Sequence, residues 1–236
     1  MKILAVECSA TPASCAILEN DKIIAESFVN VKLTHSQTLL PMIDATLKSA
    51  MLNVSDIDGF AIAAGPGSFT GVRIGISAVK GLAAADKKPC APVSTLLAMA
   101  YRLRYFNGIV CAVMDARCNQ VYNALFKCEK GIVTRLTEDR ALMVNQLAQE
   151  LAGLHKKHTL PFTVIGDVAE MFYEYARDFS FVSLADETLR YQHAVGVALA
   201  AKEEFDKNNT VTPAELLPSY LRLPQAEREL KQKQSK

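Results

Sequence analysis

The chain lacks several features that would point to a metal site, a membrane segment or a disulfide framework. It has no C-x-x-C pair among its six cysteines, no hydrophobic run of membrane length and no histidine between positions 36 and 154. The cysteine spacing fits neither a zinc site nor a small disulfide scaffold, so we expect buried, reduced thiols and a cytoplasmic protein. The first apolar stretch is too short for a signal peptide. A formal net charge of +1 provides no global field that would attract nucleic acid.

Length and hydrophobic content predict two structural units. The chain has 236 residues, of which 50% are hydrophobic, enough for two cores of roughly 110 residues each. Both halves follow the order β-β-β-α-β-α, which indicates a duplicated α/β unit. We predict a first unit over residues 1–106, a second over 107–212, and an extended, partly disordered tail over 213–236.

Hydrophobic periodicity and turn signals place the individual elements. In the first half we expect strands over 2–7, 14–19, 22–31 and 58–64, and helices over 35–51 and 68–85. In the second half we expect strands over 109–114, 120–126, 131–136 and 162–165, and helices over 143–154, 168–177 and 190–205. Thr34 and Gln37 have the spacing of a capping box at the start of the first helix. Pro41 should kink that helix or shift its start.

The most informative segment is 65–75, which reads Gly-Pro-Gly-Ser-Phe-Thr-Gly-Val-Arg-Ile-Gly. Gly65 and Gly67 allow a sharp turn after a buried strand, and Ser68 can cap the helix that follows. A junction of strand, glycines and helix can bind an anion. It is not a Walker A motif, because no Gly-Lys-Ser/Thr follows. A packing role for the glycines is therefore favoured over phosphate binding.

The helix after this segment has more apolar and small surface than a surface helix of a monomer needs. Gly71 and Gly75 share a face with Ala78 and Leu82. The glycines either pack against the chain's own first helix or admit the helix of a partner, and we expect the second arrangement. The first helix is apolar too and can share the contact. The expected interface residues are His35, Leu39, Ile43, Gly67, Ser68, Phe69, Gly71, Arg73, Gly75, Ala78 and Leu82.

Together with other motifs, the glycine segment resembles the signature of the bacterial tRNA threonylcarbamoyladenosine biosynthesis family TsaB, also called YeaZ. The accompanying motifs run through the chain: His35-Ser36-Gln37, Leu40-Pro41-Met42-Ile43, Pro92-Val93-Ser94-Thr95-Leu96, Asp115-Ala116-Arg117, Val121-Tyr122 and Pro218-Ser219-Tyr220-Leu221-Arg222. The resemblance implies an actin-like, Hsp70-like (ribonuclease H-like) fold. It also implies a heterodimer with a catalytic paralogue, TsaD, which the ATPase TsaE joins. Contact with tRNA would be indirect, and a homodimer can form when the chain is alone.

The residues that would carry catalysis in the paralogue are replaced here. Its metal-binding H-x-x-x-H pair falls on Thr95 and Met99, which are poor ligands. The turns that begin at Glu7 and Asp115 contain no glycine to admit phosphates. Asp167 stands where the paralogue has a glycine, and we expect it to cap a helix instead. We therefore predict no catalytic, cofactor-binding or metal-binding residue, and we expect Arg117 to form a salt bridge across its hairpin.

Two functions of other classes remain open. The first is a metal-dependent peptidase of the glycoprotease-like class, which needs metal ligands and a general base. A serine peptidase is a variant of this idea, although nothing in the sequence places Ser68, His35 and Asp115 together. The second is an actin-like nucleotide-binding enzyme, which the glycine-free turns disfavour. Peptidase assays and calorimetry with ATP distinguish both from a non-catalytic scaffold.

Overall fold

The chain folds around two β-sheets, which the computed structural model describes over residues 1–222, apart from the side chain of His158. The first sheet has the order β3-β2-β1-β4-β5. Its strands are β1 (Lys2–Glu7), β2 (Ala13–Glu19), β3 (Lys22–Val29), β4 (Gly59–Gly65) and β5 (Cys90–Ser94). β1 pairs antiparallel with β2 and parallel with β4, and β4 is buried along its whole length.

The second sheet repeats this arrangement. Its strands are β6 (Gly108–Asp115), β7 (Gln120–Glu129), β8 (Ile132–Arg135), β9 (Arg140–Met143), β10 (Phe162–Ile165) and β11 (Val182–Leu184). The order β8-β7-β6-β10-β11 corresponds to β3-β2-β1-β4-β5 in the first sheet, and β9 pairs with β7 beside this path. The predicted α/β, actin-like fold with duplicated units is confirmed.

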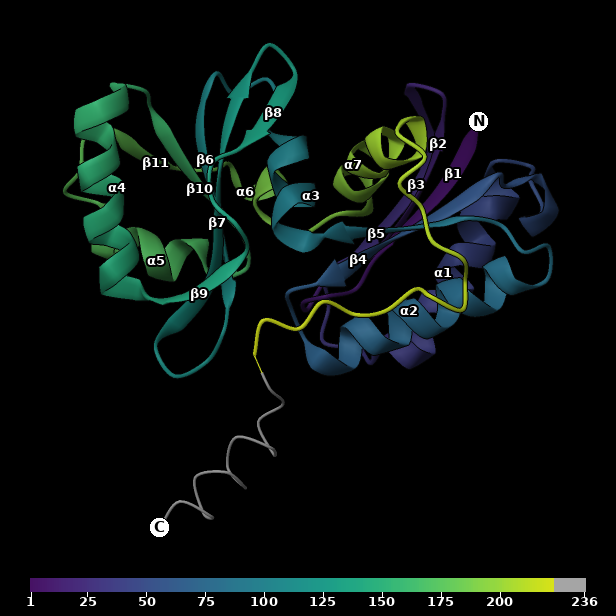
Figure 1. The fold of residues 1–236 in the computed structure, drawn as a ribbon. Coiled ribbons are helices and arrows are strands. Elements are labelled where there is room, and N and C mark those ends of the chain that lie inside the picture. The colour runs from purple at the N-terminus through teal and green to yellow at the C-terminus, as the bar shows by residue number, and fades with distance from the viewer. Residues whose placement is uncertain (223–236) are drawn as a thin grey trace.

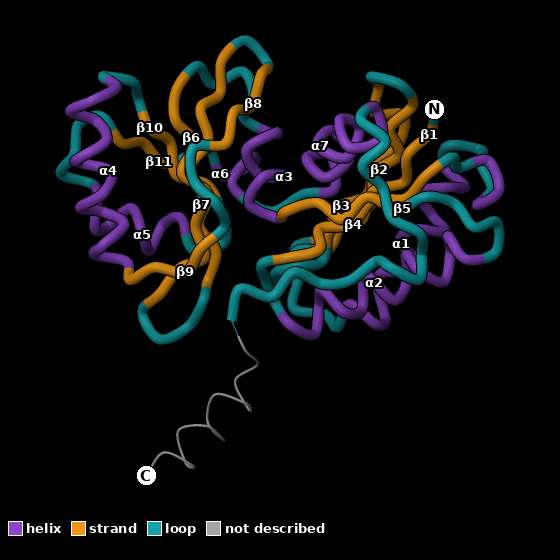
Figure 2. Tube along the Cα trace, in the orientation of Figure 1, coloured by secondary structure: helices purple, strands orange, loops and turns teal. Residues whose placement is uncertain are grey.

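Helices cover both faces of the first sheet and separate it from the second (Figure 1). The helices are α1 (His35–Ser49), α2 (Phe69–Ala84), α3 (Thr95–Arg102), α4 (Val144–His158), α5 (Ala169–Ala176), α6 (Glu187–Arg190) and α7 (Ala194–Asp206), with a 3-10 turn at Val54–Asp56. α1 and α2 pack on one face of the first sheet, and α3 and α7 pack on the other. α4 and α5 cover the outer face of the second sheet. Figure 2 shows the same layers by element type.

Two helices join the predicted units. α7 lies within the range 107–212, yet it packs against β1 and β2 of the first sheet. α3 lies within 1–106, yet Leu96 and Met99 pack among residues of β6 and β7. These helices form the layer between the sheets, so the two cores are in contact. The boundary at residue 106 stays a prediction.

The sequence predicted a side-chain cap at the start of two helices, and the structure confirms one of them. The Ser68 hydroxyl accepts a hydrogen bond from the Gly71 N–H at 3.2 Å, which confirms the expected cap of α2. Thr34 occupies the N-cap of α1, but its hydroxyl donates to Oε1 of Gln37 at 2.8 Å and caps no backbone group. The expected capping box is therefore wrong. Pro41 lies inside α1, which still begins at His35.

After α7 the chain returns across the first unit, and we call residues 210–222 the strap. It crosses β5, follows α2 and ends near the space between the sheets (Figure 1). The described part of the predicted tail has no helix or strand, as expected, while 223–236 lie outside the described residues. None of the helices within residues 1–222 is both long and apolar enough to cross a bilayer.

Candidate functional site: a cleft and a helix groove

A cleft of about 830 Å³ lies between the two units. The turn after β1 and the start of α2 form one side, and the turn between β6 and β7 with Asp167 forms the other. Residues 219–222 of the strap complete its lining. Because β1, β4, β6 and β10 are parallel within their sheets, their carboxyl ends meet at this edge, which is where open α/β sheets bind ligands.

Acidic side chains lie in and near this cleft: Asp115 and Asp167 line it, and Glu7 is buried at the end of β1. Glu7 is fully buried, and its Oε1 accepts a hydrogen bond from the Ser9 N–H at 2.6 Å. Burial raises the pKa of Glu7 to about 7, and the charge of Asp167 acts in the same direction. Burial also raises the pKa of Asp167 to about 6, with Asp115 contributing. Negative charge on these carboxyl groups would repel a phosphate, so they disfavour phosphate binding in the cleft.

Asp167 does not cap a helix. The N-cap of α5 is Val168, and no side chain caps that end. Oδ1 of Asp167 makes no hydrogen bond of ordinary geometry with the described residues. The expected capping role is therefore wrong, because the chain turns after Gly166 so that the carboxyl group lines the cleft.

Three consecutive residues of the turn between β6 and β7 have a left-handed backbone conformation, although none of them is a glycine. Arg117, Cys118 and Asn119 have φ values of 63°, 55° and 57°. The Asp115 carboxylate accepts the Arg117 N–H at 2.7 Å and pairs with its guanidinium at 3.1 Å. The predicted salt bridge of Arg117 is confirmed, and it ties this residue to its own turn. In a glycine-rich loop a phosphate can approach the backbone N–H groups closely. Here the side chains of the turn occupy that space.

The two positions that we expect to correspond to the paralogue's metal ligands are buried. Thr95 and Met99 are at most 1% exposed and lie in α3. Among the described residues, no three His, Cys, Asp or Glu side chains come together as a metal site would need. The absence of a bound metal stays a prediction.

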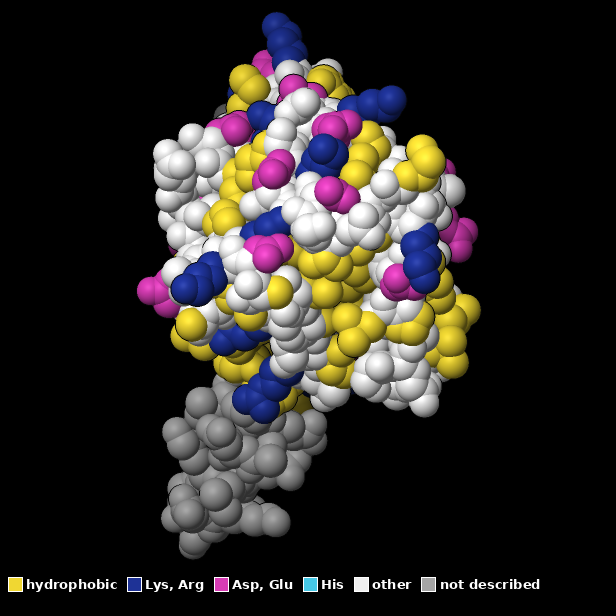
Figure 3. Space-filling view, turned by 90° about the vertical axis from the view of Figure 1, so that its right-hand side faces the viewer, with side chains coloured by type: hydrophobic (Ala, Val, Ile, Leu, Met, Phe, Trp, Pro, Cys, Tyr) yellow, Lys and Arg dark blue, Asp and Glu magenta, His cyan; other side chains and the backbone are white. Residues whose placement is uncertain are grey.

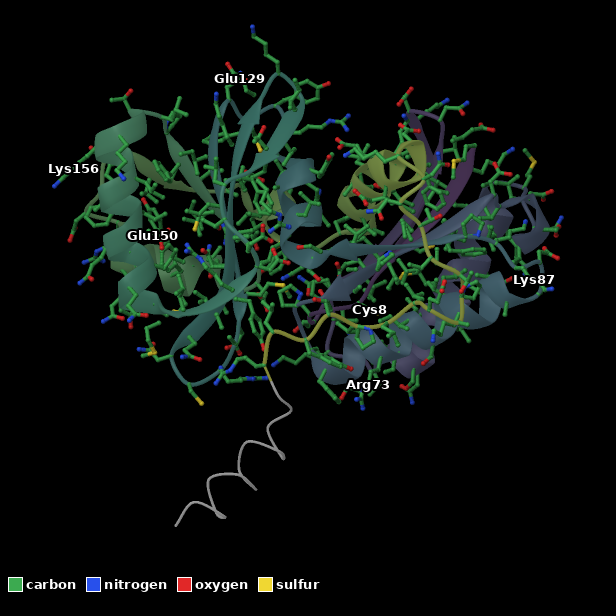
Figure 4. The ribbon with its side chains drawn as sticks, viewed as in Figure 1. Cys8, Arg73, Lys87, Glu129, Glu150 and Lys156 are labelled. Carbon is green, nitrogen blue, oxygen red and sulfur yellow. The ribbon has the colours of Figure 1, made fainter. Side chains whose placement is uncertain are left out.

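The glycines of α2 pack against the chain itself. A Cβ on Gly71 would lie 2.2 Å from the carbonyl oxygen of Cys8, and one on Gly75 would lie 2.6 Å from Sγ of Cys8 and 2.7 Å from Cδ1 of Ile62. Figure 4 shows Cys8 on the sheet side of α2 and Arg73 on its outer side. Our expectation that Gly71 and Gly75 admit a partner's helix is therefore wrong. Their contacts are mainly with the end of β1 and with β4.

Of the other expected interface residues, two are buried and seven are at least partly accessible to solvent. Leu39 and Ile43 lie in the core of the first unit with the two glycines. Seven are at least partly accessible: His35, Gly67, Ser68, Phe69, Arg73, Ala78 and Leu82. Whether a partner contacts them stays a prediction.

An apolar groove of about 420 Å³ runs between α1 and α2. Its lining comprises His35, Ser36, Leu39, Leu40, Arg73, Ile74, Ser77 and Ala78. Sequence reasoning missed Ser36, Leu40, Ile74 and Ser77. The sequence offered only an additional apolar residue, Leu40, next to the predicted apolar face of the first helix. That Leu40 is 53% exposed is known from the structure alone. Figure 3 shows hydrophobic side chains gathered low on the outer side of the first unit, at the height of α1 and α2 in Figure 1.

Comparison with known proteins identifies the family. The model of the family described as "TsaD: tRNA N6-adenosine threonylcarbamoyltransferase" matches residues 23–230. A Bacillus subtilis protein named "tRNA threonylcarbamoyladenosine biosynthesis protein TsaB" is 30% identical over 231 residues, covering 96% of both chains. The chain belongs to the TsaB family. The Escherichia coli protein of the same name is 31% identical over 228 residues, covering 94% of this chain and 95% of that one.

A solved structure supports the same assignment. "YeaZ from Pseudomonas aeruginosa" superposes with a TM-score of 0.80 at 28% identity, covering 93% of this chain and 99% of that one. The predicted membership of the TsaB family is thus confirmed over nearly the whole chain.

In this TsaB family member, the strap carries one of those motifs to the cleft. The Tyr220 ring stacks on Phe69 with centroids 4.7 Å apart, and its hydroxyl accepts a hydrogen bond from Nε of Arg73 at 2.7 Å. The Ser219 N–H donates to the Ala64 carbonyl at 2.8 Å. The Pro218–Arg222 segment therefore joins the end of β4 and the start of α2.

Proposed function

We propose that this TsaB family member takes part in the biosynthesis of threonylcarbamoyladenosine in tRNA as a non-catalytic partner of the transferase TsaD. In this proposal the two form a heterodimer in the cytoplasm, the ATPase TsaE joins them, and tRNA is reached through the complex. The names of the relatives support the pathway, and the features of this chain described below support its role within it.

The observation that carries the proposal is the groove between α1 and α2. Leu40 is about half exposed beside Ile74 and Ala78, while the neighbouring Leu39 is already buried within the chain. An exposed apolar groove between two helices suits an apolar helix of another protein. Arg73 at its edge offers a directional contact for a carboxylate or carbonyl group.

The cleft supports the non-catalytic part of the proposal. Nucleotide chemistry needs donors that stabilise phosphate charge. Here Glu7 and Asp167 are acidic, and the turn at Arg117 to Asn119 presents side chains in place of glycines. We therefore propose neither the nucleotide-enzyme nor the peptidase alternative.

Shared ancestry supports the choice of partner. The family model that matches this chain is described by the transferase's name, so the proposed partner would be a relative with a related fold. Related folds offer related surfaces, and two such helix pairs can pack as a bundle. When TsaD is absent, a second copy of this chain is the natural occupant, which gives a homodimer.

Introducing a negative charge into the groove tests whether TsaD docks there. Leu40→Glu places a carboxylate where the partner's apolar side chains would lie, and we expect at least a hundredfold weaker binding to purified TsaD by calorimetry. Met51→Glu is the matched control, because Met51 is 91% exposed just beyond α1. Its affinity should equal that of the wild type. Equal affinity of the Leu40→Glu variant would reject the groove as the docking site.

A further inference from the structure

The first part of the strap is fixed to the first unit. Cys90 and Val211 exchange two backbone hydrogen bonds of 2.8 Å each. Leu216 is 0% exposed and belongs to the core of the first unit. Nζ of Lys80, from α2, donates to the Ala214 carbonyl at 3.0 Å. These contacts make residues 211–216 a part of the first unit.

The second part of the strap reaches the other unit. Residues 219–222 line the cleft, and the Arg222 guanidinium donates a hydrogen bond to the Ala116 carbonyl in the turn between β6 and β7. A guanidinium held by a carbonyl makes a charge-assisted bond, which is stronger than a neutral one. The strap therefore links the units at the cleft, on the side away from the α3 and α7 layer.

Arg73 takes part in both the strap contact and the groove. Its guanidinium carbon lies 3.7 Å from the centroid of the Phe69 ring, and its Nε donates to the Tyr220 hydroxyl. The same side chain lines the groove between α1 and α2. The bond to Tyr220 uses only Nε, so a partner group would reach the two terminal nitrogens. A contact that pulls the guanidinium across the groove would lengthen the bond from Nε to Tyr220.

We propose that the strap is a releasable clamp across the cleft, and that Arg73 couples its release to occupation of the groove. With the groove empty, Tyr220 and Arg222 hold the two units at one separation. Docking draws Arg73 toward the partner, weakens the Tyr220 contact and allows the cleft to widen. The clamp is a property of this chain alone, whereas its coupling to docking rests on the proposed function.

Distance measurement between the units tests the clamp in the free protein. Spin labels go on Ser49→Cys in α1 and Gln149→Cys in α4, both exposed, in a Cys118→Ser background that leaves only buried cysteines. We expect Arg222→Gln to shift the distance distribution to longer values and to broaden it. Arg177→Gln makes the same chemical change on the exposed end of α5 and should leave the distribution unchanged. An Arg222→Gln distribution identical to that of the wild type would overturn the clamp.

Partner affinity tests the coupling. Tyr220→Phe keeps the ring on Phe69 and removes the hydrogen-bond acceptor of Arg73, so docking no longer has to break that bond. We expect binding to TsaD to tighten on the order of fivefold. Tyr175→Phe, on the exposed face of α5, is the matched control and should not alter the affinity. Unchanged or weaker binding by the Tyr220→Phe variant would overturn the coupling.

The two experiments separate this inference from the proposed function. If wild-type protein does not bind TsaD, the proposed function and the coupling both fail, while the distance measurement still decides the clamp. If binding is normal and Arg222→Gln leaves the distances unchanged, the proposed function stands and the clamp fails.

Discussion

Gly71 faces the carbonyl oxygen of Cys8 so closely that a Cβ at this position would lie 2.2 Å from it. The residue after β1 and the first turn of α2 thus meet backbone to backbone. This contact sets the distance between α2 and the first sheet, and with it one wall of the groove. The glycine is required for the chain's own packing.

A methyl group at Gly71 is therefore expected to be destabilising. The clash is with backbone, which cannot rotate away, so Gly71→Ala should lower the free energy of unfolding by about 1–3 kcal/mol in urea titrations. Gly81→Ala is the control in the same helix, because nothing lies within 4 Å of a Cβ there. It should raise stability by up to about 1 kcal/mol through helix propensity. Equal effects of the two variants would contradict this account.

The contribution of Glu7 to stability should fall between about pH 4.5 and pH 7 because this side chain is buried. Its pKa rises from 4.5 to about 7 in the folded protein, so the folded state binds the proton more tightly than the unfolded state. The resulting loss on raising the pH should be on the order of 2–3 kcal/mol, seen in urea titrations at both limits. Glu7→Gln should remove most of it. Glu129→Gln, at an exposed carboxyl, should keep the wild-type slope. Because His193 contributes a slope of the opposite sign over much of this range, the test is the difference between the wild type and Glu7→Gln, and identical slopes of these two proteins would contradict the assignment.

His193 should stay neutral well below its ordinary range. Burial lowers the pKa of this ring to about 4, and the charge of Arg102 adds to the shift. Nδ1 accepts the Val195 N–H at 3.2 Å at the start of α7, which requires an unprotonated nitrogen. Because the folded pKa is depressed, the stabilisation is present above pH 6.5 and is lost as the pH falls toward 4. A ring titration followed by nuclear magnetic resonance should show a midpoint near 4, and a midpoint near 6.5 would refute the prediction.

ATP should bind weakly or not at all to the isolated chain. Asp167, which lines the cleft, opposes a triphosphate, and the β6–β7 turn offers it no glycine. Calorimetry with ATP and Mg²⁺ should detect no heat of binding at concentrations up to about 1 mM, a range that corresponds to about 4 kcal/mol of binding free energy. Saturable micromolar binding of ATP to the wild type would contradict this prediction and count against the non-catalytic assignment.

Sequence patterns predicted those elements whose limits depend on residues close together in the chain. The alternation and turn signals gave β1 and β10 with their observed bounds, and Ser68 marked the start of α2 because its cap lies within three residues. β5 and α3 were missed as elements. β5 is only five residues long and contains Pro92, and it is held by pairing with β4 and Val211, far away in the sequence.

The sequence could not decide which side of an apolar helix is covered. Leu39 and Leu40 are adjacent and chemically identical, yet one is 1% and the other 53% exposed. The difference comes from the position of β2 and α2, which only the tertiary structure supplies. The same holds for Gly71, whose close neighbour Cys8 is distant in sequence, and for Tyr220, whose contacts with α2 depend on the return of the chain after α7.

The central claim is that this chain supplies a docking surface and performs no catalysis. Its most direct test is a titration of the chain into purified TsaD, TsaE, tRNA and threonylcarbamoyl-adenylate, with modified tRNA measured by mass spectrometry. We predict no product from the chain alone and a rise with added chain that saturates at one copy per TsaD. Full modification without the chain, or product formation by the chain in the absence of TsaD, would contradict the account.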